Sequence, residues 1–516
     1  MLDYKLDNFY QMLEQNKQKF PKKPIIFCEG TTLNNTQLID NVDILARHLE
    51  LGGIKPGDKI ALILSNSVEF IISFFAVTRI GAVCVPINNF LKREELEFIL
   101  NDCEARWLFT SNKFLKEVKS LQKATTVEKT IWCDDFKDLD ESNFSFDSIL
   151  NSVHEDHVHH HNPLIDDLAV IVYTSGTTGK PKGAMLSYKN IFSNVISANK
   201  RFEITQKDRF VVYLPMFHSF TLSIMVLLPF YSASAIVILK SVFPFSNVLK
   251  AALLKRVTIF LGVPTVYNAL LKAKIPWYFM WFNKIRAFIS GSAPLSEKAI
   301  NDFESKFKSA PILEGYGLSE CSPAVCINPL NKQKPLSVGI PLQSYEVKIV
   351  DEELQELKLG EVGEIIVQGD CVMQGYLNRP EATQETIING WLKTGDLGKM
   401  DEDGYIYIVD RKKDLIISKG INIYPREIEE VIYTLDEVEL AAVVGFKDEH
   451  LDEVPMAFVQ LKEDHQISEK QIKAHLKKHL ANFKVPKTII IKDELPKNAT
   501  GKVLKRVLKE EVQKGL

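Results

Sequence analysis

Short apolar runs alternate with longer segments of helical character along most of the chain. Residues 59–64 (KIALIL) and 83–87 (VCVPI) are expected to form buried strands, and the segment between them, 67–82, is apolar on nearly every face of a helix. Apolar strands separated by helices are typical of parallel sheets with both faces covered. The pattern therefore predicts an α/β architecture with mainly parallel sheets, and similar strand-like runs recur at 169–173, 210–214, 235–239, 258–263 and 287–291.

The pattern changes near Asp410. Beyond that point we expect a helix at 468–481, with Ser468 as its N-cap, and a last basic helix from about Lys502. The strands expected in this part are 440–446, 455–461 and 488–492. These elements predict a small α+β unit, large enough to fold alone.

At 516 residues the chain is too long for a single hydrophobic core. We expect an N-terminal domain at 1–409, a hinge at 410–413 and a mobile C-terminal domain at 414–516.

Composition narrows the possible partners and the compartment. The net charge of −3 provides no global field for nucleic acid, so no nucleic-acid partner is expected. Residues 470–516 nevertheless hold 13 Lys/Arg against 4 Asp/Glu, which fits either a solvated helical face or a local surface for anions. Seven cysteines without a C-x-x-C pair, and an N-terminus without a signal peptide, predict a reducing, cytoplasmic location.

Two unusual segments have ordinary explanations. Residues 210–239 carry no charge, but Pro215, Pro229 and His218 favour a buried helix and strand over a membrane span. Residues 151–162 hold five of the eleven histidines, in an irregular spacing that predicts a solvated linker rather than a metal site.

A polar, glycine-rich turn at 173–186, YTSGTTGKPKGAML, is the first candidate for chemistry. It departs from the common nucleotide loop G-x-x-x-x-G-K-[ST], because Pro181 follows Lys180 and prevents a helix from starting there. Its glycines expose backbone N–H groups, and its hydroxyls and lysines add donors, as in an anion-binding nest. The residues expected to bind the phosphates of ATP are Thr174, Ser175, Gly176, Thr177, Thr178, Gly179 and Lys182.

With five further motifs in order, the chain resembles the adenylate-forming superfamily of acyl-CoA synthetases, peptide-synthetase adenylation domains and luciferases over nearly its whole length. The further motifs are GSAPL (291–295), EGYGLSE (314–320), GWLKTGDLG (390–398), DRKKDLIISKG (410–420) and PKNATGK (496–502). The resemblance implies an acyl-CoA synthetase-like fold. It also implies a two-step reaction in which a carboxylate attacks the α-phosphate of ATP and a thiol then displaces AMP.

The resemblance also assigns roles to residues. Lys502 would contact the carboxylate and the α-phosphate, Thr174 and Glu320 would contact Mg²⁺, and Lys413 would be the hinge residue. Residues on the AMP side would be Gly291, Ser292, Ala293, Glu314, Gly315, Tyr316, Gly317, Ser319, Asp396 and Arg411. Ser418, Lys419 and Gly420 would approach CoA, although Ile417 stands where some relatives have a lysine.

The acid is expected to be apolar. LPMFHSFTL (214–222) resembles the segment that lines the acyl tunnel of fatty acyl-CoA synthetases, with His218 as a gate near the carboxylate. No charged residue lies between Arg209 and Lys240 to pair with the amine of an amino acid. A medium- or long-chain fatty acid is therefore expected as substrate, with aryl acids open as the alternative.

Three questions about partners stay open at this stage. The thiol could belong to CoA or to the phosphopantetheine of an acyl carrier protein. The aromatic run at 275–282 could anchor a buried loop or touch a membrane peripherally. Oligomeric state has no signal in the sequence, and a homodimer remains possible.

Overall fold

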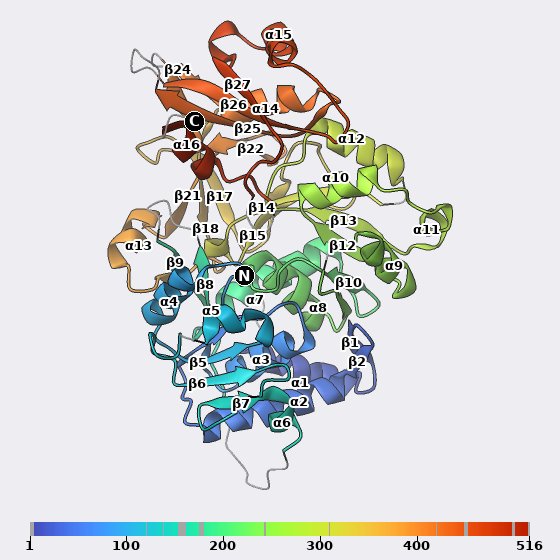
Figure 1. The fold of residues 1–516 in the computed structure, drawn as a ribbon, viewed down its shortest axis with the longest axis vertical. Coiled ribbons are helices and arrows are strands. Elements are labelled where there is room, and N and C mark those ends of the chain that lie inside the picture. The colour runs from blue at the N-terminus through green and yellow to red at the C-terminus, as the bar shows by residue number, and fades with distance from the viewer. Residues whose placement is uncertain are drawn as a thin grey trace.

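The computed structural model describes residues 5–119, 121–137, 139–152, 161–174, 180–241, 244–308, 310–418, 421–447, 453–497 and 501–513. Two large sheets with flanking helices make up most of the molecule (Figure 1). The C-terminal residues form a smaller unit at one end of its long axis, shown in orange and red.

The first sheet has eight strands in the order β19-β9-β8-β4-β3-β5-β6-β7. Its strands from β8 to β7 are parallel, whereas β9 is antiparallel to both β8 and β19. The bounds are β3 (Lys59–Leu62), β4 (Val83–Pro86), β5 (Ala105–Thr110), β6 (Lys129–Trp132), β7 (Asn143–Ser145), β8 (Leu168–Thr174), β9 (Lys182–Ser187) and β19 (Gly375–Tyr376).

The second sheet has nine strands in the order β16-β15-β14-β13-β12-β10-β11-β1-β2. It is parallel from β14 to β1, and antiparallel at both edges. The bounds are β1 (Pro24–Cys28), β2 (Thr31–Asn34), β10 (Arg209–Val212), β11 (Ala235–Ile238), β12 (Ile259–Gly262), β13 (Ala287–Ser290), β14 (Ile312–Gly317), β15 (Ala324–Ile327) and β16 (Ile340–Pro341).

Apolar helices fill the space around the two sheets. One hydrophobic core includes side chains from α1, α2, α3 and α7 together with strands of both sheets. Ser187 caps α7 by accepting a hydrogen bond from the Asn190 backbone N–H at 3.2 Å, as its position before the helix predicts. The bounds are α1 (Phe9–Lys19), α2 (Asn35–Leu51), α3 (Val68–Arg79), α4 (Arg93–Asp102), α5 (Leu115–Val118), α6 (Phe146–Leu150), α7 (Tyr188–Phe202), α8 (Leu228–Tyr231), α9 (Ser246–Leu254), α10 (Pro264–Lys272), α11 (Trp277–Phe282) and α12 (Glu297–Lys306).

A third sheet departs from the expected parallel arrangement, because all its strand pairs are antiparallel. Short turns join β20 to β21 and β21 to β22, the latter at Gly404, and a short turn can join only antiparallel neighbours. Residues 406–410, just before the expected hinge, belong to a strand of this sheet. The bounds are β17 (Glu346–Val350), β18 (Gly363–Gln368), β20 (Ile387–Ile388), β21 (Trp391–Met400) and β22 (Ile406–Arg411), with α13 at Pro380–Thr386.

The C-terminal unit has apolar clusters of its own on both faces of the sheet β25-β26-β27. Ser468 caps α15 as predicted, and ion pairs such as Lys272 Nζ to Glu439 Oε1 at 2.9 Å link the unit to the larger part. The bounds are β23 (Ile416–Ser418), β24 (Ile421–Ile423), α14 (Pro425–Tyr433), β25 (Val438–Lys447), β26 (Glu453–Leu461), α15 (Glu469–His479), β27 (Thr488–Lys492) and α16 (Lys505–Gln513).

The uncharged segment 210–239 forms β10, a π-helical segment (Thr221–Leu227), α8 and β11. Its apolar side chains belong to the core, which confirms the expected buried helix and strand. Among the described helices, none combines the length and the apolar composition needed to cross a bilayer.

Candidate active site

The candidate phosphate turn joins two antiparallel strands. Thr174 ends β8 and pairs in register with Lys182 at the start of β9, and helix α7 begins only at Tyr188. A helix start directly after the turn, as in the common nucleotide loop, is therefore absent here, as Pro181 predicts. Ser175, Gly176, Thr177, Thr178 and Gly179 lie outside the described residues.

Glu320 lies opposite the end of this turn. Its Oε1 accepts a hydrogen bond from Tyr376 Oη at 2.9 Å and a longer one from Thr174 Oγ1 at 3.4 Å. The ammonium of Lys182 lies 5.2 Å from the centre of the Tyr376 ring, so the cation faces the same corner.

The oxygen atoms of Thr174 and Glu320 suit a hard cation. Thr174 and Glu320 offer oxygen donors close together, which is what Mg²⁺ binds when substrate phosphates and water complete its shell. In the described part of the chain, no cluster of three or more His, Cys, Asp or Glu could hold a metal by itself. The donor set thus fits a magnesium ion that arrives with ATP.

The predicted adenine-side loop follows β13. The Phe220 ring packs against Gly291, where an added Cβ would lie 3.3 Å from Phe220 Cζ. Ser292 adopts φ +69°. Gly291 is buried, Ser292 is exposed and Ala293 is half-buried.

Strand β14 brings Glu314, Gly315, Tyr316 and Gly317 beside this loop. A Cβ on Gly317 would lie 1.9 Å from the Pro323 carbonyl oxygen, so only glycine allows this approach of the two backbone segments. Ser319 Oγ lies 2.8 Å from Ser219 Oγ, which links the end of the AMP motif to the uncharged segment 210–239.

Glu314 holds the predicted adenine-side loop, 291–295, through a hydrogen bond. Its carboxylate is buried and accepts a hydrogen bond from the Leu295 backbone N–H at 3.3 Å. Burial raises the pKa of Glu314 from 4.5 to about 7.

The raised pKa of Glu314 predicts a pH-dependent cost in stability. Between pH 4.5 and 7 the folded state binds more protons than the unfolded state, so the free energy of unfolding falls as pH rises through this range. Glu314→Gln removes that cost and keeps an acceptor for Leu295. We expect the variant to gain roughly 2 kcal/mol relative to wild type on going from pH 5 to pH 8 in urea unfolding. An unchanged difference between the two proteins at both pH values would contradict this assignment.

Asp396 is buried between two partners. Its carboxylate accepts a hydrogen bond from Tyr316 Oη at 2.7 Å and pairs with Arg411 Nε at 3.1 Å. Strand pairing of β21 with β22 sets Asp396 directly opposite Arg411. The backbone before Asp396 is also held, because the Gly395 N–H donates to Glu364 Oε1 at 3.2 Å and Lys412 pairs with the same carboxylate.

Lys502, in the C-terminal unit, lies close enough to Asp396 and Arg411 to interact with their charges. Gly501, at φ +79°, precedes it, and a Cβ there would lie 2.7 Å from Thr265 Oγ1 at the start of α10. Burial, followed by the like charge of Arg411, lowers the pKa of Lys502 to about 8, while Asp396 and Asp414 oppose the shift. The lysine is thus half-buried, close to Asp396 and still mostly charged at neutral pH.

The predicted hinge and thiol-side residues lie between the two parts. Lys413 is in a single turn of 3-10 helix, Lys412–Asp414, directly after β22. The Asp410 carboxylate accepts a hydrogen bond from the Arg426 backbone N–H at 2.9 Å, at the start of α14. Ser418 ends β23, whereas Lys419 and Gly420 lie outside the described residues.

His218 ends the turn that starts at Pro215, just before the helical residues that lead into the π-helical segment. Its Nδ1 accepts a 3.3 Å hydrogen bond from the Phe220 N–H, and burial lowers the pKa of the imidazole to about 4. At neutral pH the ring is therefore uncharged and carries its proton on Nε2, which can donate to a carboxylate oxygen.

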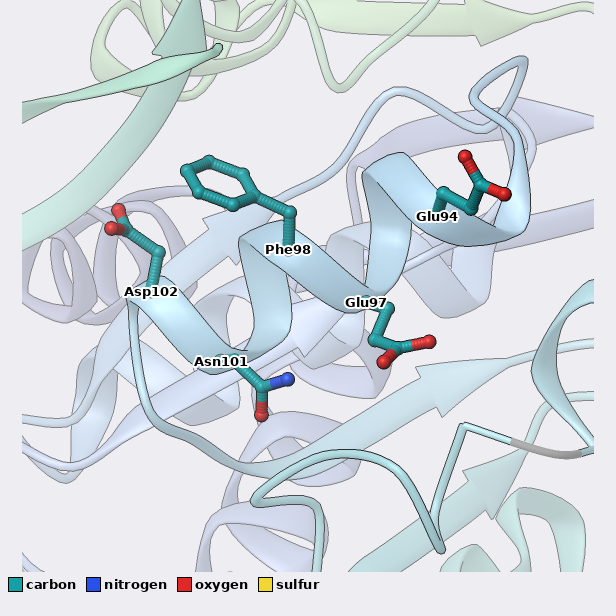
Figure 2. A pocket seen from close by; sticks show the side chains of 5 residues that line it. All are labelled: Glu94, Glu97, Phe98, Asn101 and Asp102. Carbon is teal, nitrogen blue, oxygen red and sulfur yellow. The ribbon is translucent and has the colours of Figure 1, made fainter.

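A hollow of about 480 Å³ lies on the surface of α4 (Figure 2). It borders the phosphate turn, because Asp102 accepts a hydrogen bond from Tyr173 Oη at 2.8 Å and the Lys180 ammonium lies 5.3 Å from the centre of the Phe98 ring. Its lining comes from that one helix, and the labelled side chains point in different directions rather than toward one centre. Three of the five lining residues are acidic: Glu94, Glu97 and Asp102. An acidic surface of this kind does not suit a triphosphate.

Several site residues escaped the motif comparison. Tyr376 contacts Glu320, Ser219 contacts Ser319, and Glu364 holds Gly395. Tyr376 and Glu364 come from segments without a distinctive pattern, and strand pairing such as that of β19 with β9 brings Tyr376 to the site. Ser219 lies in LPMFHSFTL (214–222), a segment that the sequence singled out for the acyl chain, but nothing in that pattern indicates its contact with Ser319.

Comparison with known proteins agrees with this geometry. The sequence model described as AMP-binding enzyme matches residues 13–377, and the one described as AMP-binding enzyme C-terminal domain matches residues 427–502. A long-chain-fatty-acid–CoA ligase of Bacillus subtilis is 34% identical over 97% of this chain and 94% of its own length. A feruloyl-CoA synthase of Amycolatopsis is 34% identical over 92% of this chain and 93% of its own.

Solved structures are similar over the same extent. An anthranilate CoA ligase in complex with anthranoyl-AMP superposes with a TM-score of 0.90 at 27% identity, covering 99% of this chain and 98% of that one. The o-succinylbenzoate coenzyme A synthetase of Bacillus subtilis, in complex with ATP and magnesium, gives a TM-score of 0.85 at 30% identity, covering 96% and 99%. The chain belongs to the AMP-binding enzyme family, and it is an AMP-forming acid–thiol ligase.

Proposed function

We propose that the protein activates a medium- or long-chain fatty acid with ATP and transfers the acyl group to CoA. The observation that carries this proposal is the uncharged segment 210–239, which meets the AMP motifs at two points. Ser219 contacts Ser319, and Phe220 packs against Gly291. An acid whose carboxylate lies at the α-phosphate would therefore extend its tail among apolar side chains, with the neutral His218 at the entrance.

The relatives support the same reaction with different acids. The Bacillus ligase is named for long-chain fatty acids, whereas the feruloyl-CoA synthase and the anthranilate CoA ligase are named for aromatic acids. An aryl acid is thus the second candidate, because an uncharged pocket accepts rings as well as alkyl chains.

In the first half-reaction, the proposed roles follow from charge. Lys502 would hold the acid's carboxylate against the α-phosphate and stabilise the charge that builds on its oxygens. Asp396 would accept hydrogen bonds from the ribose hydroxyls, Arg411 would donate to the ribose, and Tyr316 would stack on adenine. A magnesium ion held by Thr174 and Glu320 would neutralise the departing pyrophosphate.

In the second half-reaction, a thiol attacks the acyl carbon and AMP leaves. We propose that the domain 414–516 turns about residues 410–413 after adenylation, so that Lys502 withdraws and Ser418, Lys419 and Gly420 approach the site. Because Ile417 cannot donate a charge-assisted hydrogen bond, the backbone of that loop would serve the thiol. All seven cysteines are unpaired, which supports a reducing, cytoplasmic setting.

A panel of acids tests the proposed substrate. AMP release is measured with ATP, CoA and one acid at a time: hexanoate, decanoate, palmitate, oleate, benzoate and ferulate. We expect kcat/KM to rise with chain length and to be lowest for the aryl acids. Fastest turnover of ferulate or benzoate would replace the fatty acid by the aryl acid. Parallel reactions with a phosphopantetheinylated acyl carrier protein in place of CoA identify the acceptor, and a higher rate with the carrier protein would overturn the CoA assignment.

A further inference from the structure

The short helix α11 presents aromatic side chains to solvent instead of burying them. Trp277, Tyr278, Trp281 and Phe282 expose 72%, 45%, 81% and 64% of their surface, whereas Phe279 exposes 2%. Residues four apart lie on the same face of a helix, so these four aromatics form one surface opposite the buried Phe279. This answers the question that the sequence left open: only one residue of the run is a full anchor.

The helix is capped at its C-terminal end. Asn283 donates from Nδ2 to the Phe279 carbonyl at 2.8 Å and to the Met280 carbonyl at 3.3 Å. These bonds satisfy carbonyls that a helix end leaves unpaired. The exposure of the tryptophans is therefore a property of an ordered, anchored element.

Helix α9 extends the apolar surface. The two helices are in contact, and α11 lies at the outer edge of the molecule with α9 beside it (Figure 1). Leu254, in α9, exposes 66% of its surface. Large apolar side chains exposed on two neighbouring helices are typical of an interaction site.

The part of the chain that contains these aromatics is rich in positive charge. Residues 209–296 contain nine Lys/Arg and no Asp or Glu. Some of these cations are neutralised from elsewhere, such as Lys272 by Glu439 and Arg286 by Asp208. Within the described ranges, Lys250, Lys274 and Lys284 form no ion pair with a carboxylate, and two of them, Lys274 and Lys284, flank α11 directly.

We infer that α11, with Leu254, Lys250, Lys274 and Lys284, is a docking surface for an anionic lipid bilayer. Tryptophan, tyrosine and phenylalanine rings partition into the interface between headgroups and acyl chains, and lysines at their border are attracted by anionic lipid. Protein interfaces are also rich in aromatic residues, but their cations are mainly arginine and they are depleted in lysine, whereas the cations named here are all lysines. The bilayer matches both features. The surface lies outside the residues assigned to the reaction, so this inference does not depend on which acid is activated.

Co-sedimentation of the full chain with vesicles tests the inference. We expect binding to vesicles of phosphatidylcholine with about one-third phosphatidylglycerol, weakened by salt, and little binding to pure phosphatidylcholine. Trp277→Ser with Trp281→Ser should reduce the apparent affinity at least about tenfold. Lys274→Gln with Lys284→Gln should reduce it about tenfold or more, since one lysine near an anionic surface contributes about fivefold.

Controls separate docking from misfolding. Leu359 exposes 61% of its surface in a turn before β18, so Leu359→Ser removes a comparably exposed apolar side chain elsewhere and should leave vesicle binding unchanged. Both α11 variants should keep wild-type AMP formation with a water-soluble short-chain acid. If a variant loses this activity, the test uses wild-type protein and vesicles that contain brominated lipid. Quenching of the tryptophan fluorescence supports docking, and unchanged fluorescence overturns the inference.

Three results would overturn the inference. The first is wild-type protein that remains in the supernatant with anionic vesicles. The second is equal binding by the tryptophan variant and wild type. The third is a concentration-dependent dimer, or a complex with acyl carrier protein, that the tryptophan variant loses while neither protein binds vesicles; the surface would then belong to a protein partner.

Discussion

Lys502→Ala is expected to abolish most adenylate formation and to spare thioester formation. The lysine is the cation that lies close to Asp396 and Arg411, at the point where carboxylate and α-phosphate would meet. Loss of a preorganised cationic donor at such a point costs about 10²–10³ in rate. The measurement is acid-dependent exchange of labelled pyrophosphate into ATP, compared with CoA thioester formation from chemically prepared acyl-adenylate.

The pH dependence supplies an independent check on Lys502. Since its pKa in the free protein is about 8, kcat/KM for adenylation should fall as pH rises through that value, because the ammonium loses its charge. Lys497→Ala, which removes a lysine from the same segment, is the matched control and should keep both half-reactions. Equal loss of both half-reactions in Lys502→Ala would contradict the assigned role.

Asp396→Ala is expected to raise the KM for ATP strongly. Two ribose hydroxyls would lose a charged acceptor, and such hydrogen bonds contribute about 1.5–3 kcal/mol each, so kcat/KM for ATP should fall by about 10²-fold or more. The KM for the acid should change little, because the ribose contacts do not touch the acyl chain. Initial rates at varied ATP and varied acid separate the two constants.

The partners of Asp396 provide the control for this change. Tyr316→Phe removes the 2.7 Å hydrogen bond to Asp396 but keeps the carboxylate and the aromatic face. It should reduce kcat/KM for ATP by only a few-fold, since one neutral donor to a carboxylate is lost. A KM for ATP in Asp396→Ala within threefold of wild type would rule out ribose binding by this residue.

Local patterns predicted much of the fold. Ser187 and Ser468 cap the helices that follow them, and the segments expected as buried strands at 59–64 and 169–173 correspond to β3 and β8. Such features depend on residues close together in the sequence. The antiparallel third sheet was not foreseen, because the apolar runs indicate burial but not strand direction.

Contacts between distant segments could not be predicted from one sequence. Tyr376 and Glu320 are 56 positions apart, and Ser219 and Ser319 are 100 apart, so no periodicity relates them. The same holds for α11. Its composition is equally suited to a buried anchor or an exposed surface, and only the packing of Phe279 and the cap by Asn283 decide between the two.

The fate of the carboxylate oxygen tests the central claim most directly. The acid that reacts fastest in the panel is labelled with ¹⁸O in its carboxylate and supplied with ATP and CoA, and the AMP is analysed by mass spectrometry. Attack of a carboxylate oxygen on the α-phosphate, followed by attack of the thiol on the acyl carbon, leaves one labelled oxygen in every AMP. Labelled AMP at one atom per thioester is the predicted result. Unlabelled AMP would contradict an acyl-adenylate and, with it, the roles proposed for Lys502 and Asp396.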